Sequence, residues 1–134
     1  MDDQQGFHFV ELLTVLAIVG IVLSLGFPLY SQYLTQVKRL EAAHALTALA
    51  VGMEQYWAEH NTYAGATLAA LHSPESVANQ HYRLSIQSAD YADYVVVATP
   101  LAEQAEKDAA CGKLVLNAVG EKKVTGVEKI EQCW

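Results

Sequence analysis

The feature that most constrains this chain is an apolar run near its N-terminus, from Phe7 to Tyr30. The one charged side chain in the run is Glu11, and its one histidine is His8. As a helix the run would span about 36 Å, whereas the hydrocarbon core of a bilayer is roughly 30 Å thick. The sequence therefore predicts one transmembrane helix, and its 134 residues leave room for one modest globular domain.

The residues that follow the run continue the helix with an amphipathic pattern. Between Gln32 and His60, apolar side chains recur mostly at spacings of three and four, which is the period of a helix with one packed face. They are Val37, Leu40, Leu46, Leu49, Met53, Tyr56 and Trp57. Charged side chains such as Lys38, Arg39 and Glu41 fill much of the other side, so we expect that side to meet water.

The C-terminal half has the alternating pattern of β-strands after an irregular connection over residues 66–80. We expect strands over 81–87, 91–99 and 113–119, and a fourth over 122–125. Short connections favour an antiparallel meander, and the amphipathic half of the long helix can cover its apolar face. The predicted fold is α+β, a long N-terminal helix packed on a small antiparallel sheet of three or four strands.

Two cysteines, Cys111 and Cys133, lie 22 positions apart beyond the predicted membrane anchor. A lone pair in that place favours a disulfide in an oxidising compartment, with a stabilisation of about 3 kcal/mol from loop closure. A thiol oxidoreductase needs a closely spaced pair with one activated thiolate, which this spacing does not provide.

Catalytic and metal-binding patterns are missing from the sequence. The five histidines are scattered, and no two have the i, i+4 spacing of a helical metal site. Ser73 and Ser76 lack the glycine-rich turn of a nucleophile elbow, and no phosphate-binding loop is present. We therefore expect no metal, no cofactor and no enzymatic activity.

The net charge of −7 disfavours general binding to nucleic acid, because the chain repels phosphate. Half of the eight basic residues fall between Cys111 and the C-terminus, where the local net charge is +1. These are Lys113, Lys122, Lys123 and Lys129. They are the candidate DNA contacts, although the local charge supports nucleic-acid binding only weakly.

The residues that open the apolar run form a short motif: Gly6, Phe7, three residues, then Glu11. This motif at the mouth of an N-terminal apolar helix resembles the processing signal of type IV pilins. The resemblance implies cleavage between Gly6 and Phe7 by a prepilin peptidase, which also methylates the new amino group of Phe7. It also implies that Glu11 pairs with the amino group of a neighbouring subunit during assembly. The alternative is that Glu11 only reaches the lipid head groups, because a carboxylate within a bilayer is costly.

The likeness extends over nearly the whole chain. Residues 54–57 and 61–64, the run Cys111–Asn117 and the final Cys133 and Trp134 resemble the small minor pilins of the type IVa class. The resemblance implies a leader over residues 1–6, a membrane and assembly helix over 7–30 and a periplasmic pilin domain over 31–134. It also implies a minor pilin rather than a major one.

Gly20 and Pro28 bracket the weakest part of the predicted anchor, because glycine costs a helix about 1 kcal/mol and proline about 3. Similar spans in pilins unwind within filaments. An ordinary kinked membrane helix is the other interpretation, since both residues are tolerated there.

The implied function is a pilus subunit in adhesion, twitching motility or DNA uptake. Its partners would be the peptidase, other pilin subunits, the inner-membrane assembly platform and, before assembly, the membrane itself. The chain would then lie in the inner membrane first and in a surface pilus afterwards. A type II secretion pseudopilin and a permanently anchored periplasmic binding domain stay as alternatives. The leader departs from the pilin pattern, because Asp2 and Asp3 stand where lysine or arginine is usual. The positive-inside rule alone would place Lys38 and Arg39, with the domain they begin, in the cytoplasm.

Overall fold

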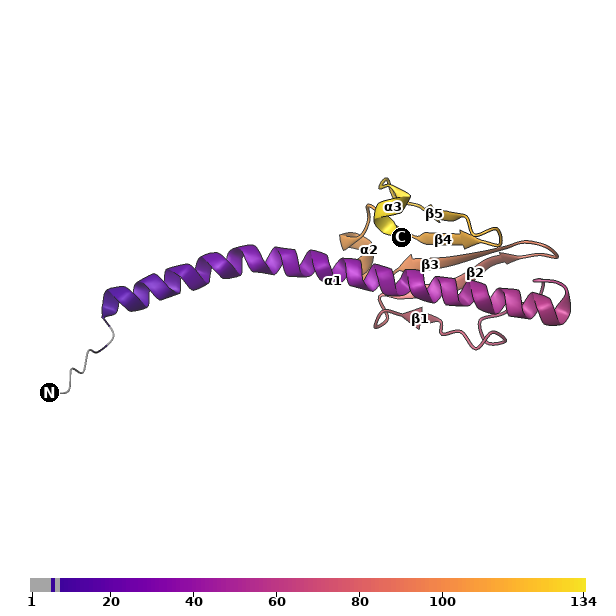
Figure 1. Cartoon of the computed structure of the whole chain (residues 1–134), viewed down its shortest axis with the longest axis horizontal. Coiled ribbons are helices and arrows are strands. Elements are labelled where there is room, and N and C mark those ends of the chain that lie inside the picture. Colours follow the sequence, from indigo (N-terminus) through magenta and orange to yellow (C-terminus); the bar gives the residue numbers. More distant parts are fainter. Residues whose placement is uncertain (1–5, 7) are drawn as a thin grey trace. The chain divides into compact units, whose positions relative to one another are not determined.

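A computed structural model describes Gly6 and residues 8–134 (Figure 1). The chain divides into two compact units, the first ending at Leu34 and the second running from Thr35 to Trp134. One long helix, α1 (Phe9–His60), contributes to both units. The second unit adds β1 (Ser76–Val77), β2 (Tyr82–Ala89), β3 (Tyr94–Pro100), α2 (Ala102–Lys107), β4 (Leu114–Asn117), β5 (Lys122–Val124) and α3 (Ile130–Cys133).

The sheet of the second unit is an antiparallel meander. Its strand order is β1-β2-β3-β4-β5, so each strand pairs with its neighbour in sequence. The predicted architecture of a long helix and a small antiparallel sheet is confirmed, with five strands in place of three or four. The structure adds β1, α2 and α3, which the sequence pattern did not predict.

The boundaries of the predicted strands shift by up to three residues. β3 begins at Tyr94 rather than at Tyr91, because Asp90 N–H donates to the Asp93 carbonyl (2.8 Å) and closes a turn there. β2 continues to Ala89 through an irregularity between Ile86 and Ser88. Such a bulge changes which side chains face the core, so periodicity alone does not locate it.

The core lies between α1 and one face of the sheet. From α1 it takes Ala42, Ala43, Leu46, Leu49 and Met53, and from the strands Tyr82, Leu84, Tyr94, Val96, Ala98, Leu114 and Leu116. The strand residues alternate along β2, β3 and β4, as a half-buried sheet requires. The predictions for Leu46, Leu49 and Met53 are therefore confirmed.

The prediction that Val37 and Leu40 pack on the same face is wrong, because they are 40% and 52% exposed. The step of six positions from Leu40 to Leu46 rotates the pattern by about 240° around a helix with 3.6 residues per turn. The two side chains therefore lie on the opposite side of α1 from Leu46 and Met53. α1 has two apolar stripes in the second unit, and only one is covered by the sheet.

A disulfide closes the C-terminal region, as predicted. It joins Cys111 and Cys133, whose Cα atoms are 5.7 Å apart, and both residues are 3% exposed. The segment that it closes contains β4, β5 and α3. Because these elements are short, the covalent bond holds a region that could bury little apolar surface on its own.

Candidate functional site

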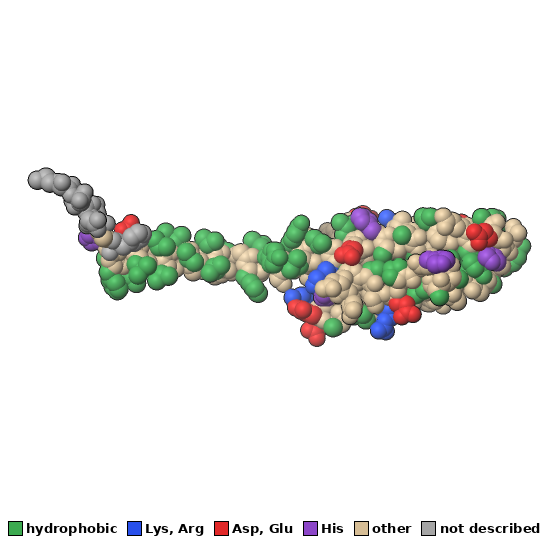
Figure 2. All heavy atoms as spheres, turned by 90° about the horizontal axis from the view of Figure 1, so that it is seen from below, with side chains coloured by type: hydrophobic (Ala, Val, Ile, Leu, Met, Phe, Trp, Pro, Cys, Tyr) green, Lys and Arg blue, Asp and Glu red, His purple; other side chains and the backbone are tan. Residues whose placement is uncertain are grey.

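The first unit presents an almost entirely apolar helix surface. From Phe9 to Leu29 its large hydrophobic side chains are 46% exposed or more. Figure 2 shows these side chains covering the visible face of the helix near the N-terminus. The Thr14 and Ser24 hydroxyls donate to the carbonyls of Val10 (2.8 Å) and Ile21 (2.7 Å), so neither presents a free donor. This surface suits lipid or other apolar helices.

Glu11 lies in the first turn of α1 and is exposed. Its backbone N–H donates to the His8 carbonyl (2.9 Å), and the positive end of the helix dipole favours a carboxylate there. No ion pair of Glu11 is recorded with any residue that the structure describes. The partner amine that the resemblance implies would come from Phe7, which lies outside the described residues.

Gly6 is exposed and precedes α1. Gly20 and Pro28 both lie inside α1, which is continuous through them. A side chain at Gly20 would meet no atom within 4 Å, so packing does not account for this glycine. Cleavage at Gly6 and unwinding between Gly20 and Pro28 stay predictions.

A stripe of mostly apolar side chains runs along α1 in the second unit on the side away from the core, and we call it the outward stripe. It consists of Val37, Leu40, His44, Thr47, Ala48 and Val51, all exposed. Val51 is 55% exposed, and α1 has no acidic or basic side chain from Ala42 to Met53 apart from His44. A helix face that permanently meets water normally carries charges. The outward stripe therefore indicates a surface that packs against an apolar partner.

The face of the sheet away from the core carries a set of cations. We define the outer sheet face by the side chains Arg83, Ser85, Val97, Thr99, Lys113, Val115 and Lys123. Strand register places them together: Arg83 is opposite Thr99, and Ser85, Val97, Val115 and Lys123 form one row across four strands. Lys113 precedes the inward Leu114, and its carbonyl accepts from Thr125 N–H (3.1 Å), which continues the alternation.

Arg83, Lys113 and Lys123 are all exposed. Lys123 pairs with Glu121 at 3.2 Å, while no ion pair of Arg83 or Lys113 is recorded with any described residue. Adjacent strands lie about 4.8 Å apart, so Arg83 and Lys113, two strands apart, are separated by about 10 Å at Cα. The arrangement gathers three exposed cations on one face of the sheet in a protein whose net charge is −7.

The structure divides the four predicted DNA contacts. Lys113 and Lys123 lie on the outer sheet face, whereas the Lys122 ammonium lies 5.0 Å from the ring centre of Trp134. Lys129 precedes α3, outside the sheet. Sequence reasoning missed Arg83, although the alternation along 81–87 had already placed it on the side facing away from the core.

Among residues 6 and 8–134 no group of three or more histidine, cysteine, aspartate or glutamate side chains could hold a metal ion. Both cysteines are in the disulfide.

Residues 28–115 match the family described as "Type IV minor pilin ComP, DNA uptake sequence receptor". The match includes Arg83 and Lys113 and ends before Lys123. It therefore spans most of the second unit and the last turns of the membrane-like part of α1.

Two curated relatives are type IV major pilins. The chain is 29% identical to PilE1 of Neisseria gonorrhoeae over 113 residues, which cover 84% of this chain and 51% of that protein. It is 28% identical to PilA of Myxococcus xanthus over 86 residues, 64% of this chain and 39% of that protein. The chain thus spans about half the length of these relatives, or less.

A solved structure, the minor pilin PilV of Neisseria meningitidis, has a similar fold with a TM-score of 0.52. The match covers 71% of this chain and 93% of PilV. At 15% identity it supports the fold alone.

Proposed function

This chain belongs to the type IV minor pilin family, and from that premise we propose that it enters a pilus through α1 and contacts DNA there with its outer sheet face. Type IV pilins are structural subunits of a filament, so the chain is not an enzyme. Adhesion, motility and DNA uptake are distinct roles for such a subunit. The family description favours DNA uptake among them.

The observation that carries filament entry is the outward stripe. Val37, Leu40 and Val51 are 40 to 55% exposed in a stripe whose other members are His44, Thr47 and Ala48, next to a core stripe that is already packed on the sheet. Within the described part of a single chain these side chains stay exposed, whereas neighbouring pilin subunits present apolar helices. Burying three aliphatic side chains would contribute about 1.5 kcal/mol or more each.

In this proposal the chain must be cleaved and methylated at its N-terminus before it can enter a filament. A prepilin peptidase removes residues 1–6 and methylates Phe7, and the new amino group pairs with Glu11 of a neighbouring subunit. Before assembly, the first unit anchors the chain in the inner membrane, where its apolar helix is long enough to span the bilayer. The assembly platform then moves the chain into the surface pilus.

The second role, DNA contact, is supported by the three cations of the outer sheet face. A net charge of −7 opposes binding elsewhere on the chain, so these cations are the surface on which phosphate is tolerated. Thr99 and Ser85 between them add hydroxyl donors. Such contacts position a duplex but carry little sequence information.

Filament entry is tested by the amount of the chain in sheared surface filaments. Val51→Glu places a charge on the outward stripe, and Gln87→Glu makes the same kind of change at an exposed position of β2. We expect Val51→Glu to lower the filament fraction about tenfold while the membrane pool is retained, because a buried unpaired carboxylate is costly. Gln87→Glu should match the wild type.

A chain that never appears in the sheared fraction would favour the permanently anchored binding domain. Intact mass from membranes with and without the host peptidase reports on maturation separately. Loss of residues 1–6 and gain of one methyl group only with the peptidase would support cleavage after Gly6. An unchanged mass in both strains would contradict it.

A further inference from the structure

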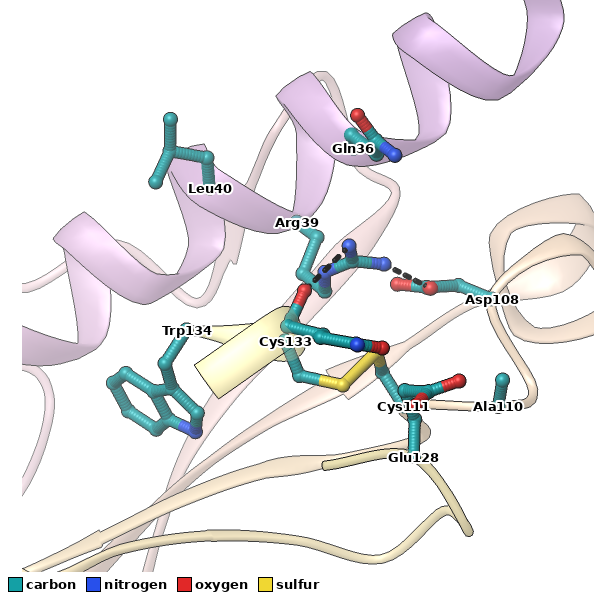
Figure 3. A pocket seen from close by; sticks show the side chains of 10 residues that line it. Gln36, Arg39, Leu40, Asp108, Ala110, Cys111, Glu128, Cys133 and Trp134 are labelled. Atoms are coloured by element: carbon teal, nitrogen blue, oxygen red, sulfur yellow. Dashed lines mark hydrogen bonds and ion pairs between the residues drawn. A yellow bond between two sulfur atoms is a disulfide. The ribbon is translucent and has the colours of Figure 1, made fainter. Parts of the chain in front are cut away.

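One side chain of α1 reaches both of the segments that the disulfide joins. Arg39 extends from α1 between Asp108 and Cys133, beside the bond from Cys133 to Cys111 (Figure 3). Its guanidinium forms an ion pair with Asp108 and donates to the Gln132 carbonyl at 3.2 Å. The proposed contacts with pilin subunits and DNA use neither this guanidinium nor the disulfide, so the arrangement needs a separate explanation.

Asp108 fixes the position of the segment that carries Cys111. The backbone N–H groups of Cys111 and Gly112 donate to the Asp108 carbonyl, at 3.1 Å and 2.9 Å. The Asp108 side chain is 4% exposed, and its second carboxylate oxygen accepts from the Tyr82 hydroxyl of β2 at 2.8 Å. Cys111 therefore follows a turn that is hydrogen-bonded to the sheet, and the ion pair holds Arg39 against that turn.

Gln104 on α2 joins the same turn to α1 a second time. Its side chain is 1% exposed, and its amide donates to the Thr35 carbonyl of α1 at 3.1 Å and to the Tyr82 oxygen at 3.2 Å. Once α1 is docked on the sheet, the segment that carries Cys111 therefore has a fixed place.

The segment that carries Cys133 is held less firmly. α3 has four residues, of which the first three are exposed, and so short a helix is not stable by itself. The Trp134 indole N–H donates to the Lys123 carbonyl at 3.3 Å, but Lys123 belongs to the same C-terminal region. A hollow of about 560 Å³ adjoins Arg39, Cys133 and Trp134, so packing does not fix α3 from that side. The bond from Arg39 to the Gln132 carbonyl joins α3 to α1 across this hollow.

We propose that Arg39 positions the Cys133 thiol for bonding to Cys111, so that the disulfide closes on a subunit in which α1 is already docked. In the reduced chain, Arg39 holds the Gln132 carbonyl, and with it the neighbouring Cys133, close to the turn of Cys111. This contact raises the effective concentration of one thiol at the other. The inference concerns the isolated subunit and depends on neither filament entry nor DNA binding.

Closure of the disulfide needs an oxidant, and a small disulfide such as glutathione disulfide can supply it. The thiolate of one cysteine attacks the oxidant, which forms a mixed disulfide and releases one glutathione thiolate. The thiolate of the other cysteine then attacks the cysteine sulfur of the mixed disulfide, and the second glutathione thiolate leaves. The two cysteines lose two protons and two electrons, and glutathione disulfide is reduced to two thiols. Arg39 acts in the second attack, because that step is intramolecular.

The positioning role is tested by the thiol–disulfide equilibrium of the full chain in detergent micelles with a glutathione buffer. Acid quenching, alkylation and intact mass give the ratio of the two forms. We expect Arg39→Met combined with Asp108→Leu to lower the equilibrium constant for disulfide formation about tenfold, because a hydrogen bond from a charged donor is lost. The double variant leaves no unpaired buried charge, so the fold should be retained.

Arg39→Lys is the second variant. It keeps a cation for Asp108, but one ammonium cannot replace the forked guanidinium in both contacts, so we expect a similar decrease. Lys107→Met is the matched control, since it removes a cation one position before Asp108 together with its ion pair to Glu103. The control should have the equilibrium constant of the wild type.

A wild-type equilibrium constant in both Arg39 variants overturns the proposal. An equal decrease in Lys107→Met also overturns it, because closure would then depend on the general charge of this region. Circular dichroism of the reduced chains separates positioning from folding. If the decrease occurs only in variants whose reduced form is unfolded, Arg39 contributes to global stability alone and the proposal is wrong.

Discussion

Arg39 on α1 forms an ion pair with Asp108, 69 positions later in the chain, and only 12% and 4% of the two side chains is exposed. Two charges in such a site are stable only together, because each has lost most of its hydration. This buried ion pair therefore holds the long helix to the C-terminal half of the sheet more strongly than an ion pair between exposed side chains would.

Removing one charge of the pair should be more harmful than removing both. We expect Asp108→Ala to lower the free energy of unfolding by about 3 to 5 kcal/mol, because the Arg39 guanidinium stays buried without its carboxylate. Arg39→Met combined with Asp108→Leu should recover most of that loss. Denaturant unfolding of the full chain in detergent measures both, and a double variant as unstable as the single one would contradict the prediction.

Removing the cations of the outer sheet face should weaken DNA binding and its dependence on salt. Each lost phosphate contact reduces the slope of log K against log salt by about 0.9 for a duplex. We expect the triple variant Arg83→Ala, Lys113→Ala, Lys123→Ala to lose two to three such contacts, because Lys123 also pairs with Glu121.

The matched control for this surface is the pair Lys122→Ala and Lys129→Ala, which removes cations from outside the outer sheet face. Fluorescence anisotropy with a labelled duplex at several salt concentrations gives both slopes. Equal slopes for the control and the triple variant would place the DNA contact elsewhere.

Two glycines should respond to alanine with opposite signs. A Cβ at Gly126 would overlap the Ala110 carbonyl oxygen, so Gly126→Ala must displace backbone beside the disulfide. A Cβ at Gly52 would touch only Leu71, at 3.7 Å, and α1 gains about 0.5 to 1 kcal/mol when a glycine is replaced by alanine. Thermal unfolding should show a lower midpoint for Gly126→Ala and a higher one for Gly52→Ala.

The subunit should lose stability in alkali through two buried tyrosines. Burial raises the pKa of Tyr82, and Asp108 raises it further against the opposing effects of Gln104 and Arg39. Burial also raises the pKa of Tyr94, with the Glu54 charge as the next cause. A raised pKa in the folded state means that stability is complete below about pH 10, where free tyrosine titrates, and falls as the pH rises above it.

Circular dichroism between pH 9 and pH 12 measures this loss. We expect Tyr94→Phe to shift the alkaline transition upward, because it removes one group that must ionise on unfolding. Tyr91→Phe is the control, since Tyr91 is 74% exposed. Identical transitions in both variants would contradict the assignment.

Much of the fold could be predicted from periodicity, and the exceptions have physical reasons. The apolar run, the core positions of α1 and the alternation in β2 and β4 follow from helix and strand geometry. Val37 and Leu40 were assigned to the packed face because most apolar residues in this stretch are three or four positions apart. The one step of six positions, from Leu40 to Leu46, moves the pattern from one apolar stripe of α1 to the other. Gln104 could not be found, since a six-residue helix has no pattern and its hydrogen bond to Thr35 spans 69 positions.

The site was predicted less completely than the fold. The processing motif and Glu11 are contiguous and were visible in the sequence, whereas the outer sheet face required strand register. Lys113 and Lys123 were grouped with Lys122 by proximity in the chain, but alternation places Lys122 on the opposite side of β5. Arg83 lies on the same face as the two lysines because β2, which carries Arg83, and β4 both pair with β3.

The carboxylate of Glu11 should matter for assembly and not for membrane insertion. Glu11→Gln keeps the shape of the side chain and removes its charge, so it cannot form an ion pair with the amine of a neighbouring subunit. We expect a membrane pool and a processed mass like those of the wild type, with about tenfold less chain in sheared filaments. Ser24→Ala is the control, because that hydroxyl already donates to Ile21 within the same helix. If Glu11→Gln enters filaments as well as Ser24→Ala, the carboxylate only reaches the head groups, and the outward stripe must account for assembly alone.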